Sequence, residues 1–562
     1  MDLSTSHNRL IYIFIVGLAI LAHLTGLLND VFISDPALYA SIAKEMVLSM
    51  NFMDLTYDGI DWLDKPHFPF WVTAVSFKII GINAFAYKLP AILFTILALV
   101  YTYKLALELY DKDTALLAVL ILATAEHLVI SNNDVRAEPY LTGLIITSIF
   151  YYHRLVREFR VGYLLLASLF AGLAIMTKGL FTLFPIVGAV GGELIIKRKW
   201  KTLFRWRWIF SLGLIILFIS PELYALHKQF DSHPEKIIFG QTGVSGIRFF
   251  IWDSQFGRFF NTGPITGKGD PFFFLHTLLW AFLPWSVLMY YSIFKQIRNN
   301  LPRRNPDQEF YTLPGILLTL LVFSLSRFQL PHYTNILFPL LAILTADFIV
   351  RANSKKELRF IYTIQYLILF LIFVSLLFLQ FLFKPEGGSF TAIMAFSLTG
   401  LVLLLSIRFR IRGKTRILYY SCLGIILLNF YLNLVFYPRL LAYQSGSQVA
   451  EYANTHYPGQ EIRTLGVLSF TIHFHADAVV RDRRLEELTE ELKNSDFLVF
   501  TSETYLDSLD MMQVEYDVLK DFEHYHTTMV TGEFLNHKTR SDALQKYFLL
   551  RAGKLSVPCK QE

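Results

Sequence analysis

Repeated apolar stretches, each long enough to cross a lipid bilayer, constrain this chain more than any other feature. A helix needs about 20 apolar residues to cross the hydrocarbon core, and the sequence holds about thirteen windows of that kind. They lie at residues 10–28, 84–107, 114–131, 139–155, 162–177, 179–196, 208–227, 272–293, 311–326, 331–350, 359–383, 389–408 and 416–437. Charged residues make up only 17% of the chain, whereas soluble domains carry about 25%. We therefore expect an α-helical polytopic membrane protein with about 13 transmembrane helices.

The placement of basic residues indicates how these windows are oriented. Cytoplasmic loops of membrane proteins carry an excess of Lys and Arg. Basic clusters lie at residues 153–160, 197–207, 295–304, 351–359 and 408–416, and each of them follows an even-numbered window. One orientation puts every cluster in the cytoplasm and leaves outside the loop 29–81, the turn 132–138, the loop 231–271 and the turn 326–332. Short, separate clusters do not indicate a nucleic-acid-binding surface, so we expect the lipid bilayer as a partner and no nucleic acid.

An odd number of spans leaves the C-terminal part outside the membrane, and the composition changes there. After Pro438 the sequence becomes polar, and short helix and strand patterns alternate. We expect helices over residues 446–456 and 485–494 and strands over 463–470 and 497–502. The predicted domains are a transmembrane domain at 1–440 and a small extracytoplasmic α/β domain at 441–562. No small-residue cleavage site follows the first window, so this window is predicted to stay as a membrane helix.

The loop 29–81 concentrates carboxylates, a lysine and aromatic side chains between apolar windows. Asp35 and Pro36 are suited to the start of a helix, and residues 37–48 fit an amphipathic helix on the membrane surface. A second interfacial helix is expected to begin at residues 64–66. Taken singly, Asp35 could be no more than a helix cap. Lys65 could be no more than a lysine whose stem lies along the apolar surface while its ammonium reaches the water interface. Both interpretations stay open at this point.

Ionisable and aromatic side chains also gather in the other turns that are expected outside. The candidates are Arg136, Glu138, Arg258, Arg327 and Tyr333, with Asp134 as a competitor of Glu138. Each has a plain alternative role. A glutamate at a helix start is favoured by the helix dipole, and arginine or tyrosine at a membrane surface serves as an interfacial anchor. Because all of them fall on one predicted face of the membrane, a shared site is favoured.

The first outer loop resembles that of the GT-C membrane glycosyltransferases. In the polyprenyl-phosphate-dependent group of aminoarabinose transferases and protein O-mannosyltransferases, this loop reads D-E-x-x-Y-x-x-I-A-x-x-M and then L-x-K-P-P-L-x-Y-W. The matching residues here are Asp35, Tyr39, Ile42, Ala43, Met46, Lys65, Pro66 and Trp71. The departures are Pro36 for a second acidic residue, Asp64 for a usual glutamate, and His67 for a second proline.

The resemblance continues through residues 10–350. Residues 136–141 take the place of an R-x-D-x-x-L motif, with Glu138 as the carboxylate, and residues 172–179 match G-L-A-x-L-T-K-G. The loop that ends in F-L-P-W at 282–285 contains Arg258, which the resemblance places at the donor phosphate. Residues 326–333 resemble S-K-x-K-L-P-x-Y. Gln255 stands where the aminoarabinose transferases have a metal-contacting histidine, so we expect no cofactor, with a divalent metal left open.

The resemblance implies an inverting transfer of a sugar from a polyprenyl-phosphate-linked donor. Asp35 and Glu138 are the expected catalytic residues. The expected substrate-binding residues are Lys65 and Arg258 at the phosphate, Arg327 in reserve for it, and Tyr39, Asp64, Arg136 and Tyr333. Cations at the phosphate stabilise the charge that develops as the glycosidic bond breaks. A partly desolvated carboxylate such as Asp35 can accept the proton of an acceptor hydroxyl.

The acceptor is less constrained than the donor. A lipid A-type glycolipid on the outer face of the bacterial inner membrane is favoured, and a protein acceptor, as in the protein O-mannosyltransferases, is the alternative. A transporter of lipids or sugars is a third hypothesis. It would place ionisable residues near the middle of the bilayer, whereas the candidate residues here lie at the ends of the windows. We expect the enzyme to be a monomer.

Overall fold

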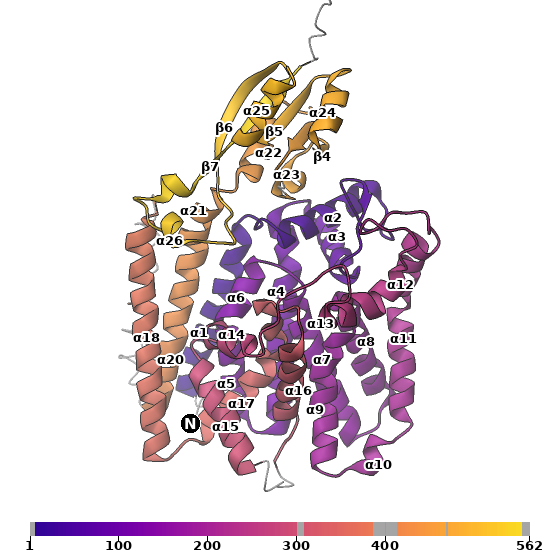
Figure 1. Cartoon of the computed structure of the whole chain (residues 1–562). Helices are drawn as coiled ribbons and strands as arrows, with labels where there is room; N and C mark the ends of the chain where they lie inside the picture. Colours follow the sequence, from indigo (N-terminus) through magenta and orange to yellow (C-terminus); the bar gives the residue numbers. More distant parts are fainter. Residues whose placement is uncertain (1–5, 301–307, 386–399, 401–412, 468–469, 554–562) are drawn as a thin grey trace, which may run out of the picture.

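The protein is a helical bundle with a small α/β domain on one end (Figure 1). The computed structural model describes residues 6–300, 308–385, 400, 413–467 and 470–553. The long helices of the bundle are α1 (Ser6–Thr25), α4 (Ala84–Leu109), α5 (Lys112–Ala123), α6 (Glu126–Asn133), α7 (Glu138–Arg157), α8 (Val161–Lys178), α9 (Leu183–Ile196), α11 (Arg207–Leu226), α14 (Phe273–Ala281), α15 (Ser286–Lys295), α16 (Thr312–Leu325), α17 (Phe338–Arg351), α18 (Lys355–Phe383) and α20 (Gly413–Tyr431). Shorter helical segments lie at η1 (Gly26–Leu28), η2 (Leu180–Thr182), α10 (Trp200–Leu203), η3 (His227–Asp231), α12 (Gly246–Arg248), η4 (Phe249–Gly257), α13 (Arg258–Phe260), η5 (Gln296–Asn300), η6 (Pro331–Leu337), η7 (Leu432–Phe436) and α21 (Tyr437–Leu441).

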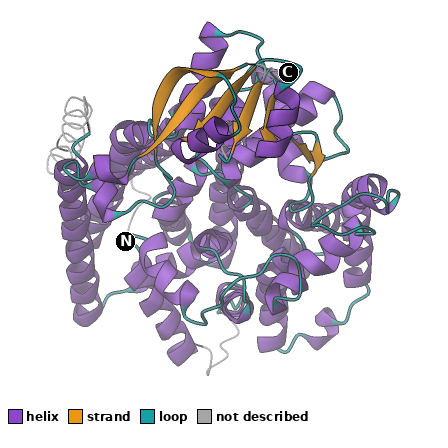
Figure 2. Ribbon diagram, turned by 45° about the horizontal axis from the view of Figure 1, so that its top comes forward, coloured by secondary structure: helices purple, strands orange, loops and turns teal. Residues whose placement is uncertain are grey.

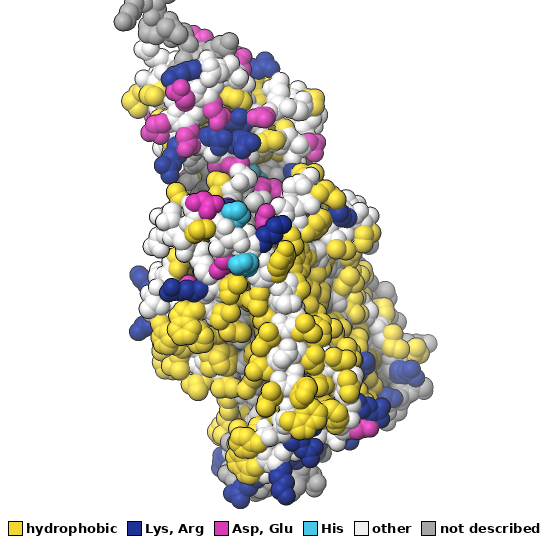
Figure 3. All heavy atoms as spheres, turned by 90° about the vertical axis from the view of Figure 1, so that its right-hand side faces the viewer, with side chains coloured by type: hydrophobic (Ala, Val, Ile, Leu, Met, Phe, Trp, Pro, Cys, Tyr) yellow, Lys and Arg dark blue, Asp and Glu magenta, His cyan; other side chains and the backbone are white. Residues whose placement is uncertain are grey.

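The helices match the predicted apolar windows. Every window other than 389–408 coincides with a helix or a broken pair of helices, and 389–408 lies almost wholly outside the described residues. By length and composition, 7 helices of the described chain can cross a membrane, or 8 if the bent pair α5 and α6 is one span. The polytopic helical class is therefore confirmed, whereas the count of thirteen stays a prediction. Figure 3 shows a broad hydrophobic surface on one side of the bundle, with Lys and Arg side chains at the end away from the α/β domain.

Two of the predicted spans are broken, and the breaks contact each other. The helices α5 and α6 meet at a bend of 48°, and α14 and α15 are separated by residues 282–285. The backbone N–H of Glu126 donates to the carbonyl of Leu283 at 3.0 Å, and the indole N–H of Trp285 donates to Thr124 Oγ1 at 3.0 Å. The polar groups that a break exposes are thus paired inside the bundle, as a lipid environment requires.

The first loop contains two helices, α2 (Asp35–Ser49) and α3 (Phe68–Ile80), joined by a hairpin of β1 (Thr56–Tyr57) and β2 (Ile60–Asp61). The start predicted for the second helix, at residues 64–66, was wrong: α3 begins at Phe68, after His67. Both helices lie on the end of the bundle that carries the α/β domain (Figure 1). Buried Lys88 of α4 fixes the start of this loop. Its ammonium donates to the carbonyls of Gly26, Asn29 and Asp30 at 3.2, 3.0 and 3.0 Å.

The C-terminal domain is a five-stranded mixed sheet with helices on both faces (Figure 2). Its elements are α22 (Ser445–His456), β3 (Ile462–Leu465), α23 (Phe470–His475), β4 (Val480–Arg483), α24 (Leu485–Leu492), β5 (Phe497–Ser502), α25 (Glu503–Met511), β6 (Tyr516–His524), α26 (Gly532–Leu535), η8 (Arg540–Ala543) and β7 (Gln545–Ala552). The strand order is β4-β3-β5-β7-β6, parallel among the first three and antiparallel at β7. Leu498 and Phe500 of β5 face one apolar core and Val499 faces the other.

The predicted elements of this domain are largely confirmed, and one was placed wrongly at its end. The predicted strand 463–470 stops at Leu465, because Gly466 turns the chain with a φ of +66°, and Phe470 begins α23. The predicted domain boundary at residues 440 and 441 falls at the end of α21.

Candidate functional site

A polar cavity of about 480 Å³ lies at the end of the bundle that carries the α/β domain. We call it the polar cavity; its ionisable and aromatic lining consists of Asp35, Tyr39, Asp64, Lys65, Arg136, Glu138, Lys178, Arg258, Phe328, His332 and Tyr333. Segments far apart in the sequence therefore meet here: the first loop, the turn before α7, the end of α8, the loop before α14, and η6. All the predicted site residues except Arg327 line this cavity.

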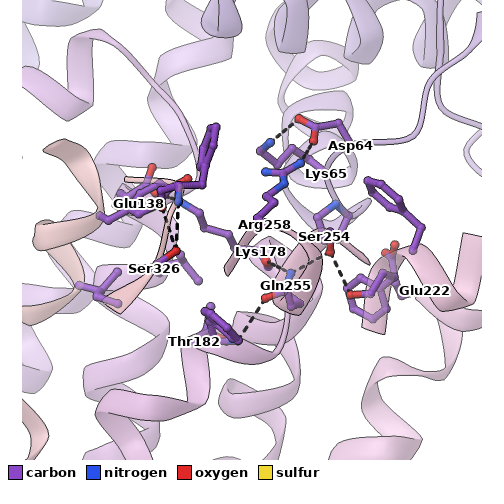
Figure 4. A pocket seen from close by; sticks show the side chains of 18 of the residues that line it. Asp64, Lys65, Glu138, Lys178, Thr182, Glu222, Ser254, Gln255, Arg258 and Ser326 are labelled. Carbon is purple, nitrogen blue, oxygen red and sulfur yellow. Dashed lines mark hydrogen bonds and ion pairs between the residues drawn. The ribbon is translucent and has the colours of Figure 1, made fainter. Parts of the chain in front are cut away.

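Asp64 connects the two cations that were predicted to bind a phosphate. One of its carboxylate oxygens pairs with the ammonium of Lys65 and the other with the guanidinium of Arg258 (Figure 4). Burial raises the pKa of Asp64, but Lys65 and Arg258 outweigh this effect and hold its pKa below the ordinary value. Among the described residues, no partner takes the buried Nε–H of Arg258.

Asp35, at the start of α2, is paired with Arg136. The guanidinium donates to Asp35 at 2.5 Å and to Asp134 at 3.1 Å. The carboxylate of Asp35 is 38% exposed, so an acceptor can reach it from the cavity. Asp134 does not line the cavity, and burial holds its pKa above the ordinary value despite Arg136. Their placement therefore favours Glu138 over Asp134 as the second carboxylate of the site.

Glu138 is the first residue of α7 and is only 1% exposed. Its Oε1 pairs with the ammonium of Lys178, at the end of α8, while the buried Oε2 has no partner in the described chain. The same ammonium lies over the ring of Tyr333, at 3.6 Å from the centroid, and His332 Nε2 lies 3.9 Å from Oε1. Lys178 and His332 were not predicted as site residues. Lys178 had a signal, since it stands in residues 172–179, which match G-L-A-x-L-T-K-G, whereas His332 falls at the variable position of S-K-x-K-L-P-x-Y.

An apolar cavity of about 900 Å³ adjoins the polar one and shares Asp64, Lys65, Glu138, Lys178, Arg258 and Tyr333 with it. We call it the apolar cavity. Its further walls are mostly hydrophobic, with Leu141, Phe181, Phe249, Phe250, Phe323 and Ile336 among them. The mostly apolar cavity is therefore lined in part by a cluster of charged side chains (Figure 4). This arrangement fits a ligand with an apolar chain and an anionic head.

Two predicted features lie outside the charged cluster. The side chain of Arg327 is exposed and lines neither cavity, although its backbone N–H joins the turn to the carbonyl of Phe259 at 3.1 Å. The amide of Gln255 is committed to the turn after α8: it donates to the carbonyl of Lys178 at 3.1 Å and accepts from the N–H of Phe181 at 3.3 Å. In the described residues, no group of three or more His, Cys, Asp or Glu side chains is placed to hold a metal ion. Whether a metal takes part stays a prediction.

Comparison with known proteins gives matches in sequence and in structure. Residues 64–224 match the family model described as dolichyl-phosphate-mannose-protein mannosyltransferase. An uncharacterized protein of Aquifex aeolicus (strain VF5) is 26% identical over 468 residues, which cover 82% of this chain and 85% of that protein. An undecaprenyl phosphate-alpha-4-amino-4-deoxy-L-arabinose arabinosyl transferase of Edwardsiella ictaluri (strain 93-146) is 27% identical over 333 residues, covering 58% of this chain and 57% of that enzyme. The match thus spans little more than half of the transferase.

The structural match extends over the whole chain. The crystal structure of ArnT from Cupriavidus metallidurans bound to undecaprenyl phosphate has a TM-score of 0.71 at 18% identity, covering 97% of this chain and 99% of that one. The fold, including the small domain on one end of the bundle, is therefore the same.

Proposed function

We infer that this chain, which belongs to the aminoarabinose transferase-like group of GT-C membrane glycosyltransferases, moves a sugar from a polyprenyl-phosphate donor to an acceptor in the cell envelope. One observation carries this proposal: Lys65, Arg258, Glu138 and Asp35 converge on a polar cavity at the head of an apolar one. The charged cluster suits a phosphate and a sugar, and the apolar walls suit a prenyl chain. The bound undecaprenyl phosphate in ArnT supports this choice of donor.

The leaving group explains the two cations. As the bond between the anomeric carbon and the phosphate oxygen breaks, the polyprenyl phosphate takes the electron pair and gains charge. Lys65 and Arg258 can then exchange their contacts with Asp64 for contacts with the phosphate. A guanidinium binds two phosphate oxygens at once, and cations placed for the developing charge lower the barrier more than they stabilise the bound donor.

The acceptor enters, in this proposal, from the side of Asp35. An acceptor oxygen attacks the anomeric carbon opposite the phosphate, so a single displacement inverts the configuration. If the acceptor is a hydroxyl, its proton passes to the carboxylate of Asp35. If it is a phosphate, it is already ionised and Asp35 orients it. Glu138, held by Lys178, orients the acceptor or the sugar.

A lipid A-type glycolipid is the preferred acceptor, because the likeness to the aminoarabinose transferase in sequence and to ArnT in structure covers far more of the chain than the mannosyltransferase model. A protein acceptor is the alternative that this model supports. We place the reaction on the outer face of the bacterial inner membrane, because described Lys and Arg side chains gather at the end of the bundle away from the α/β domain (Figure 3). The chain is proposed to act as a monomer without a metal.

Mass spectrometry of the envelope identifies the acceptor. Lipids, glycans and glycoproteins are compared between cells that carry the gene, lack it, or carry the Asp35→Asn variant. The proposal predicts a glycolipid that loses one sugar residue in the last two strains. A change confined to glycoproteins would establish the alternative acceptor, and unchanged lipids, glycans and glycoproteins would contradict the proposed activity.

A further inference from the structure

A buried pair, His67 and Glu222, lies beside the charged cluster and has no role in the transfer described above. Both side chains are 0% exposed. The Oε2 of Glu222 accepts the backbone N–H of His67 at 2.9 Å, and its Oε1 lies 3.1 Å from His67 Nδ1. The other ring nitrogen, Nε2, lies 3.0 Å from the carbonyl of Met53. We call these contacts the His67–Glu222 clasp.

The clasp joins the first loop to α11, a helix that follows it by more than a hundred residues. Glu222 lies on α11 within a predicted span, and it also lines the apolar cavity (Figure 4). A carboxylate inside a membrane span is expensive and needs a partner, so such residues commonly serve a function. Here the partner comes from the loop that carries Asp64 and Lys65.

The contacts of the ring require a proton within the pair. Nε2 faces a carbonyl, which only accepts, so this nitrogen carries hydrogen. Nδ1 faces a carboxylate, so a proton must lie on Nδ1 or on Glu222. Burial lowers the pKa of His67, but Glu222 outweighs this effect and raises it above the ordinary value. In either case one hydrogen bond joins His67 Nδ1 to Glu222 Oε1.

The clasp acts on the segment that positions Lys65. His67 is the residue before α3, and only Pro66 separates it from Lys65. Proline fixes its own φ and restricts the residue before it, so anchoring His67 limits where the backbone of Lys65 can lie. In the related loop pattern a second proline occupies this position, and a proline has no N–H to give to Glu222.

We propose that the His67–Glu222 clasp is a positioning device for Lys65, which takes the place of the second proline of the related loops and sets the ammonium at the donor phosphate. This inference rests on the proposed function, since it assumes that Lys65 binds a phosphate. His67 and Glu222 are positioning residues, because they act through Lys65.

The test compares the affinity of the full-length protein in detergent for undecaprenyl phosphate and for undecaprenol. The dissociation constant for undecaprenol divided by that for undecaprenyl phosphate measures recognition of the phosphate alone. Damage to the apolar cavity weakens binding of both lipids and leaves this ratio unchanged. His67→Pro and Glu222→Leu should each lower this ratio about tenfold, because a small displacement of a binding group has an effect of that order or larger. The double variant His67→Pro/Glu222→Leu should recover most of the loss, because the proline then holds the turn and no carboxylate is left unpaired.

A matched control lies on the same side of the loop. Buried Gln229 of η3 accepts the N–H of Leu55 at 3.0 Å and donates to its carbonyl at 2.8 Å, ten residues before Lys65. Gln229→Leu should lower the melting temperature and leave the ratio unchanged. Single clasp variants that keep the wild-type ratio, or that weaken both lipids equally, would overturn the inference while leaving the proposed function in place. A wild-type protein that does not prefer undecaprenyl phosphate to undecaprenol would instead overturn the phosphate role of Lys65 and the proposed donor with it.

Discussion

Each charged candidate residue of the polar cavity is already paired with a residue of opposite charge. Asp64 holds Lys65 and Arg258, Arg136 holds Asp35, and Lys178 holds Glu138. Pairs of this kind keep buried charges compensated before the donor arrives, and removing one partner leaves the other uncompensated. In the proposed mechanism, the donor phosphate therefore competes with Asp64 for cations that are already in place.

At the residue scale, Lys65→Ala should weaken binding of undecaprenyl phosphate. A hydrogen bond to a charged group contributes about 1.5–3 kcal/mol, so the dissociation constant should rise about tenfold or more. Lys78→Ala is the control, since Lys78 is an exposed lysine of α3 over the ring of Phe52 and outside both cavities. Equal affinity in the Lys65 variant and the wild type, measured by titration in detergent, would exclude Lys65 from the phosphate site.

Asp35→Asn should abolish sugar transfer and leave the affinity for undecaprenyl phosphate within about twofold, because Asp35 contacts Arg136 rather than the phosphate-binding cations. Asp54→Asn, in the same loop but outside both cavities, should transfer normally. The check is incorporation of sugar into extracted lipid together with donor titration. Full transfer by the Asp35 variant would remove this carboxylate from the mechanism.

At the element scale, α2 is held between the bundle and the α/β domain. The ammonium of Lys44 donates to the carbonyls of His473 and Phe474, at the end of α23, and of Ala476, just after it, with distances of 3.0, 3.0 and 2.5 Å. A cation at a helix C-terminus satisfies carbonyls that have no partner within the helix. The α/β domain therefore holds α2, the helix that begins with Asp35, through the contact between Lys44 and the end of α23.

Lys44→Met should loosen this contact. Loss of a charge-assisted contact of about 1.5–3 kcal/mol should lower the melting temperature and speed amide hydrogen exchange in α23 and α2. Lys493→Met, on the exposed face of α24, is the control and should change neither. Wild-type exchange in α23 of the Lys44 variant would show that the lysine does not hold the two elements together.

The sequence predicted elements better than it predicted their breaks. Apolar windows fix where helices lie, since a membrane helix must bury its backbone polar groups, and the two interfacial helices followed from Asp35-Pro36 and the apolar pattern of the loop. The bend between α5 and α6 was not predicted, although Glu126 and His127 interrupt the apolar window 114–131 where α6 begins. The candidate residues of the motifs other than Arg327 line one cavity, but the partners Lys178 for Glu138 and Arg136 for Asp35 are set by helix packing, which one sequence does not reveal.

At the scale of the whole molecule, the α/β domain is bound to the loop that carries the site. Asp30 accepts from Ser447 and pairs with His475, each at 2.6 Å. The side chain of Gln444 accepts from the N–H of Ile33 at 2.7 Å and donates to the carbonyl of Val31 at 2.9 Å. The domain therefore holds the residues just before Asp35, so its docking and the geometry of the site are coupled.

The orientation of the whole chain has its own test. Single cysteines at Lys493, in the α/β domain, and at Lys199, in the basic cluster at the opposite end, are introduced into a Cys559→Ser background, since Cys422 is buried. A membrane-impermeant thiol reagent should label position 493 in intact spheroplasts and position 199 only after permeabilisation. The reverse pattern would place the site in the cytosol and contradict the proposed location of transfer.

The central claim is that the charged cluster at the head of the apolar cavity holds the phosphate of a polyprenyl donor. Cryo-electron microscopy of the full-length protein with undecaprenyl phosphate tests it most directly. The account predicts the phosphate in contact with Lys65 and Arg258, with the prenyl chain along the apolar cavity beside Phe249 and Phe323. A lipid whose phosphate lies elsewhere, with Asp64 still bound to both cations, would contradict it.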